Sequence, residues 1–163
     1  MITPLLPQTV LPLAAAAGAL GWAAISDVRH YVIPNRTVAL VATAYFLCAC
    51  SMPWSFVIGG ALAGLIVFSI ATLFFARGWM GGGDAKLITA AALWAGSPFL
   101  SSFAIVTCLS GAALGLLMLT PARRLMPAPS ADALSLSGQP MPFGVPIAIG
   151  GLVVLALNLA RLR

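Results

Sequence analysis

Residues 61–75 read ALAGLIVFSIATLFF, and a helix built from them would have no polar face. Strands of a membrane barrel alternate apolar and polar side chains, so this run predicts a membrane-spanning helix instead. The rest of the chain agrees, because 61% of its 163 residues are hydrophobic and only 7% are charged. Soluble domains carry about 25% charged residues. This composition excludes a soluble globular protein, a disordered tail and a nucleic-acid-binding module.

The number of spans follows from the gaps between charges. Four stretches carry no charged residue: 1–26, 37–76, 87–122 and 133–160. A spanning helix needs about 20 apolar residues, so the outer stretches predict one span each. Each middle stretch is long enough for two and contains a proline, Pro53 or Pro98, where a helix would stop. The sequence therefore predicts an all-α, polytopic membrane protein of six transmembrane helices, forming one domain over 1–163. The expected spans are 5–25, 37–51, 54–76, 84–96, 98–120 and 142–160.

The orientation of these spans is predicted by the basic residues. Six spans place both termini on one side and the connections 26–36, 77–83 and 121–141 on the other. Six of the eight Lys and Arg residues lie in or beside these connections. The positive-inside rule makes this side cytoplasmic. Arg161 and Arg163 are the discordant charges, at the opposite side.

Only three acidic residues occur in the chain, namely Asp27, Asp84 and Asp132. Asp27 and Asp84 are each expected at the cytoplasmic end of a span. A charged side chain at the edge of the hydrocarbon is costly, which makes it a candidate for function. A lone Asp at a helix end is often an ordinary loop or capping residue, but the predicted topology brings these two to one face. Asp132 lies in a loop rich in Pro, Ser and Ala, for which we expect no catalytic role.

A pair of close carboxylates can activate water without a metal or a cofactor. Because both cannot easily ionise together, they share a proton. One then accepts a proton from water while the other donates to a substrate carbonyl. The glycines at 81–83 would let a substrate backbone approach Asp84 without a Cβ in the way. The three cysteines lie in apolar runs without a C-x-x-C pair and predict no metal site.

Three segments resemble the motifs of bacterial prepilin leader peptidases. Asp27, followed after five residues by Ile33-Pro34-Asn35, is similar to the first motif, and GGGDAKL at 81–87 is similar to the second, Gly-x-Gly-Asp-x-Lys. Residues 142–150 resemble the third, with Phe143 in place of Tyr. The resemblance implies an aspartic endopeptidase with Asp27 and Asp84 as its catalytic residues. It implies substrate-binding or site-shaping roles for Gly81, Gly83, Lys86, Ile33, Pro34, Asn35 and Gly144. Asn35 is also a candidate cap for the second span.

The same resemblance implies a substrate and a location. The substrate would be a prepilin or pseudopilin precursor, cut between a short basic leader and a hydrophobic helix. The location would be the bacterial inner membrane, with the catalytic residues at the cytoplasmic face and both termini in the periplasm. Long members of the family carry a further domain with paired C-x-x-C motifs and methylate the new N-terminus. This chain resembles the short form found with Flp/Tad-type pili, so we expect no cofactor, no methylation and no nucleic-acid partner.

Other classes of function remain open from the residues alone. A small transporter could place Asp27 and Asp84 in a proton or cation path, although such paths usually carry ionisable groups near mid-membrane. A non-enzymatic pilus-assembly membrane protein would need neither residue beyond stability. Presenilin-like proteases share the Gly-x-Gly-Asp pattern but place the first Asp within a span, whereas Asp27 is expected at a span end.

Overall fold

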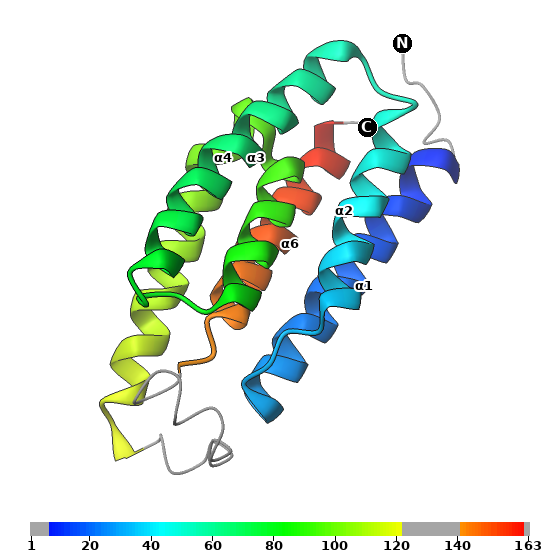
Figure 1. The fold of residues 1–163 in the computed structure, drawn as a ribbon. Coiled ribbons are helices and arrows are strands. Elements are labelled where there is room, and N and C mark those ends of the chain that lie inside the picture. Colours follow the sequence, from blue (N-terminus) through cyan, green and yellow to red (C-terminus); the bar gives the residue numbers. More distant parts are fainter. Residues whose placement is uncertain (1–6, 122–140, 162–163) are drawn as a thin grey trace.

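The structure is a computed structural model that describes residues 7–121 and 141–161. Every element assigned within these ranges is a helix, and the helices pack side by side as a bundle (Figure 1). The described part of the chain is therefore all-α, as predicted. Most of the predicted connection 121–141, with Asp132, lies outside the described residues. The helices are α1 (Pro7–His30), α2 (Asn35–Ala49), α3 (Trp54–Ala76), α4 (Gly82–Met118) and α6 (Gly144–Arg161).

Prolines set the starts of α2 and α3. Pro34 and Pro53 are the residues just before these helices, and both have extended backbone conformations. Proline has no amide hydrogen and a fixed φ, so it ends one segment while its carbonyl begins the next helix. The amide of Thr37 donates to the Pro34 carbonyl at 3.0 Å, and that of Phe56 donates to the Pro53 carbonyl at 2.9 Å. The predicted break at Pro53 is confirmed.

Four of these helices are long and apolar enough to cross a membrane: α1, α3, α4 and α6. The prediction of six spans is therefore not supported by helix length and composition. Helix α2, the predicted second span, has 15 residues and is about 22 Å long, which is shorter than the roughly 30 Å of bilayer hydrocarbon. The predicted fourth and fifth spans lie together in α4, which has 37 residues.

Helix α4 is interrupted at Gly96, whose φ of 54° and ψ of −173° are not helical. The two parts of α4 reach the same place on α6. Ala91 lies 3.5 Å from the position of a Cβ on Gly151, and Phe103 lies 3.1 Å from that of a Cβ on Gly150. A straight helix would place Ala91 and Phe103 about 18 Å apart along its axis. The chain therefore folds back at Gly96, as the green and yellow-green parts of α4 show (Figure 1).

The buried face of α1 leads directly to one of the candidate catalytic residues. Its buried positions recur every three or four residues, which is the spacing of one face of a helix. Small side chains on this face let the neighbouring helices approach closely. The same face ends in a carboxylate, so the packing of α1 determines where that acid lies. The stripe consists of Leu13, Ala16, Leu20, Ala23 and Asp27.

Candidate active site

Asp27 lies in the last turn of α1, which ends at His30. Its side chain is buried, with only 5% of its surface exposed. The backbone N–H of Gly144 donates a hydrogen bond of 2.6 Å to Asp27 Oδ2. Gly144 is the first residue of α6, where backbone N–H groups lack partners within the helix and the positive end of the helix dipole favours a negative charge. The α6 N-terminus therefore supplies the partner that a buried carboxylate needs.

Asp84 lies in the first turn of α4, three residues after the N-cap residue Gly81. Its half-buried carboxylate accepts a hydrogen bond from the backbone N–H of Gly81. An acidic side chain at the third helical position commonly satisfies the N-cap amide in this way. Asp84 is therefore not the cap itself, as an ordinary capping residue would be. It reaches back across the first turn of α4.

The carboxylates of Asp27 and Asp84 come together although 57 positions separate them in the sequence. They lie close enough to interact electrostatically. Asp27 ends the buried face of α1, and Asp84 begins α4. The first and second predicted motifs therefore meet at one end of the bundle, and the hydrogen bond from Gly144 brings the third motif to the same place.

Two further contacts join the first motif to the second. A Cβ added to Gly83 would lie only 3.2 Å from Ile33 Cβ, so these segments are in close contact. Lys86 Nζ donates a hydrogen bond of 3.1 Å to Asn35 Oδ1. Asn35 itself is the first residue of α2, and the N-cap is Pro34 without a side-chain cap bond. The expectation that Asn35 caps this helix is therefore wrong, because its side chain binds Lys86 across the site.

The turn between α1 and α2 contains residues that the sequence did not single out. Tyr31 has a φ of 54°, a backbone conformation that residues other than glycine seldom adopt. Its amide donates to the Asp27 carbonyl at 2.8 Å, and Ser26 Oγ donates to the Val32 carbonyl at 2.8 Å. These bonds turn the chain sharply after α1 and return residues 33–35 toward Asp27. In the sequence, Ser26 directly before Asp27 and Pro34 directly before α2 are the signals for this turn.

The site residues expected from the sequence thus lie together at one end of the bundle, Pro34 through its place between Ile33 and Asn35 and the others through the contacts above. The arrangement supplies two carboxylates of different exposure, each accepting a backbone N–H, beside a glycine segment that is partly open to solvent. Such a pair can act as general acid and general base. No group of three or more metal-ligating side chains lies within residues 7–121 and 141–161. The expected site residues are Asp27, Asp84, Gly81, Gly83, Lys86, Ile33, Pro34, Asn35 and Gly144.

Comparison with known proteins bears on this arrangement. A sequence model of the type IV leader peptidase family matches residues 14–116. The matched range is more than half of the chain and includes both Asp27 and Asp84. Searches of curated proteins and of solved structures gave no match. The extent of the family match decides the assignment: the chain belongs to the type IV leader peptidase family.

Proposed function

We propose that the protein is an aspartic endopeptidase that removes the leader from prepilin or pseudopilin precursors. Asp27 and Asp84 are the proposed catalytic residues, and membership of a leader peptidase family supports the class of reaction. The observation that carries the aspartic mechanism is the meeting of Asp27, at the end of α1, and Asp84, at the start of α4, near enough for their charges to interact. They are two of only three acids in the chain.

In the proposed mechanism the two carboxylates hold one proton between them. The ionised member takes a proton from water, and the resulting hydroxide adds to the carbonyl carbon of the scissile peptide bond. The protonated member gives its proton to the carbonyl oxygen, which yields a neutral tetrahedral intermediate. The C–N bond then breaks as the leaving amine takes a proton from the Asp27–Asp84 dyad, and a hydroxyl of the intermediate returns one proton to the dyad as the carboxylic acid product forms. Gly144 would act through its N–H, which fixes the orientation of Asp27.

The remaining site residues are proposed to shape the space around the dyad. Gly81 and Gly83 would leave room for an extended substrate backbone beside Asp84. The close approach of Gly83 to Ile33 supports a second reason for glycine there, because a Cβ would push the two segments apart. The hydrogen bond between Lys86 and Asn35 would hold the α1–α2 turn against the start of α4.

We further propose that the site lies at the cytoplasmic face of the bacterial inner membrane. In this topology α2 and both parts of α4 cross the membrane together with α1, α3 and α6, which places both termini in the periplasm. The reversal of the chain at Gly96 supports separate crossings for the two parts of α4. Basic residues at the end of the bundle that holds the dyad support the orientation. They are Arg29, Arg36, Arg77 and Lys86.

A cleavage assay in membranes tests the proposed function. The protein is co-expressed with a prepilin of the Flp type, and loss of the leader is followed on a gel at matched membrane levels. We expect Asp27→Asn and Asp84→Asn each to lose at least about 100-fold in rate, because an amide cannot exchange the proton. Asn keeps an oxygen that can accept the N–H bond, so the fold should survive. Asp132→Asn is the matched control and should cleave normally. Persistent cleavage by either dyad variant would reject the aspartic mechanism.

A further inference from the structure

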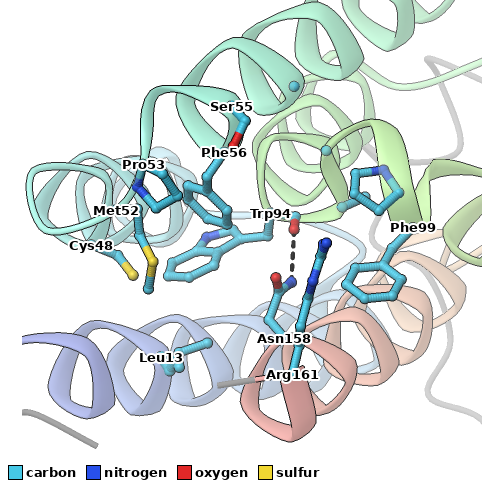
Figure 2. A pocket seen from close by; sticks show the side chains of 14 residues that line it. Leu13, Cys48, Met52, Pro53, Ser55, Phe56, Trp94, Phe99, Asn158 and Arg161 are labelled. Carbon is cyan, nitrogen blue, oxygen red and sulfur yellow. Dashed lines mark hydrogen bonds between the residues drawn. The ribbon is translucent and has the colours of Figure 1, made fainter. Parts of the chain in front are cut away.

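A pocket of about 320 Å³ lies at the end of the bundle opposite the candidate active site, and Figure 2 shows it from close by. Its lining includes Trp94 from the first part of α4 and Asn158 from the last turns of α6. These residues follow Asp84 and Gly144 by 10 and 14 positions, which places them about 15 and 21 Å further along their helices. The pocket is therefore separate from the site that holds the two carboxylates.

Hydrogen bonds between three helices hold the walls of this pocket in place. The indole N–H of Trp94, which is only 1% exposed, donates to the Val41 carbonyl of α2 at 3.1 Å. The side-chain amide of Asn158 donates to the Trp94 carbonyl at 2.9 Å, as the dashed line shows (Figure 2). It also donates to the Val154 carbonyl at 3.0 Å. Because these partners are fixed by backbone and core packing, the pocket exists without a ligand.

The pocket is mostly apolar but has one cation at its edge. Leu13, Phe56 and Phe99 contribute apolar surface, and Arg161 contributes a guanidinium group. The guanidinium carbon lies 6.0 Å from the centre of the Phe99 ring. A guanidinium group that stacks on an aromatic ring contacts the ring with its flat face. Its N–H groups point outward in the guanidinium plane and can still donate hydrogen bonds to a ligand. Asp27 and Asp84, the acidic residues within 7–121 and 141–161, lie at the other end of the bundle. Arg161 therefore has no acidic partner in this part of the chain.

We propose that this pocket binds an anionic phospholipid, with part of an acyl chain between the apolar walls and the phosphate on Arg161. The volume corresponds to roughly ten water molecules, which suits one extended chain and excludes a peptide helix of about 10 Å diameter. Four helices of the bundle are long and apolar enough to cross a bilayer. In a membrane, the pocket between these helices would therefore be close to lipid. The planar fork of arginine matches phosphate with two parallel hydrogen bonds, and Arg161 is the one charged residue among the described residues that line the pocket.

Tryptophan fluorescence provides a probe inside the pocket. Trp22, Trp54 and Trp79 are 61%, 79% and 65% exposed, so each can be replaced by Phe without opening the core. The full chain with these three changes keeps Trp94 as its one tryptophan. Phospholipids brominated on their acyl chains quench tryptophan that they touch. The purified protein in detergent is titrated with brominated phosphatidylglycerol, which is anionic, or with brominated phosphatidylcholine, which has no net charge.

We expect half-maximal quenching of Trp94 at a lower concentration of the anionic lipid, by up to about tenfold, because the quaternary ammonium of phosphatidylcholine offsets the charge of its phosphate and weakens its contact with Arg161. Arg161→Gln should remove this preference, and Arg161→Lys should keep part of it. Arg77→Gln is the matched control, because Arg77 also stacks on an aromatic ring, that of Trp79 at 5.4 Å in the parent chain, but does not line the pocket.

Three results would overturn the proposal. The first is an absence of Trp94 quenching by either lipid. The second is equal quenching by both lipids in the parent protein. The third is a preference for the anionic lipid that survives in Arg161→Gln. The emission maximum of Trp94 without lipid verifies the fold of each variant, and Arg161→Lys supplies the decisive comparison if the glutamine variant is altered.

Discussion

Replacement of Gly144 by alanine tests how Asp27 is positioned. A Cβ on Gly144 would lie 2.9 Å from Asp27 Oδ2, 3.0 Å from its Cβ and 3.1 Å from its Cγ. Favourable contacts between carbon atoms need about 3.5–4.0 Å. Because Asp27 is buried and accepts the Gly144 N–H at 2.6 Å, it cannot keep this bond and also make room for the methyl group. The carboxylate must move away from the start of α6.

The size of the effect follows from the bond that is lost. A hydrogen bond to a charged group contributes about 1.5–3 kcal/mol, and each 1.36 kcal/mol changes a rate by about tenfold. Loss of the bond alone predicts cleavage about 10-fold to 100-fold slower. A displacement of about 1 Å at a reacting group can by itself cost about 100-fold. We therefore expect Gly144→Ala to cleave a prepilin about 100-fold more slowly than the wild type.

The assay is a time course of leader removal in membranes with matched amounts of each variant. Gly111→Ala is the matched control, because it also replaces a helical glycine near the start of α6. A Cβ on Gly111 would meet only Pro146, at 3.8 Å, which is an ordinary contact. We expect this control to stay within about twofold of the wild type. A Gly144→Ala rate above about half of the wild-type rate would refute the positioning of Asp27 by this contact.

Two other predictions concern packing and the link between the motifs. Gly60→Ala should lower the free energy of unfolding in detergent by about 1–3 kcal/mol, because a Cβ would overlap the Tyr45 hydroxyl and lie 2.7 Å from a carbonyl oxygen of α4. Gly18→Ala, which faces open space, should not lower the stability, and an equal loss in both would contradict the packing explanation. Lys86→Met and Asn35→Leu should each slow cleavage by up to about fivefold, as expected for an exposed polar pair. The double variant should be no slower than either single one, and fully additive losses would show that the two side chains act independently.

The place of the candidate site could be predicted because charged residues are so rare in this chain. Asp27 and Asp84 stand at the ends of long apolar runs, and ionisable residues at the membrane are rare and mark functional sites. The expected motif around Gly144 also lies at the site, through a backbone N–H rather than a side chain. Glycine patterns indicate where a backbone can approach another segment closely. The glycine at position 144 was therefore a sequence signal for this close contact.

The number and limits of the helices were predicted less well, for a physical reason. Charge-free stretches show which parts of the chain can enter a membrane. They do not show at which residue a helix ends or the chain reverses direction. Nothing in residues 26–30 breaks a helix, so α1 continues past the expected end at residue 25 and carries Asp27 on its buried face. At Gly96 the chain reverses within one assigned helix, two residues before Pro98, where the sequence predicts a break. The apolar pocket was not predicted, because residues far apart in the sequence line it without forming a motif.

The hydrogen bond from Gly144 to Asp27 spans 117 positions of the sequence, and this has a consequence for synthesis. The chain leaves the ribosome from its N-terminus, so Asp27 and Asp84 are made well before the start of α6. Until then Asp27 lacks its backbone partner, and the proposed dyad has no fixed geometry. If the proposed function is right, proteolytic activity would therefore begin only after the start of α6 has been made and has reached Asp27. The position of Gly144 late in the sequence would then delay activity until the helices that carry the two carboxylates are already in place.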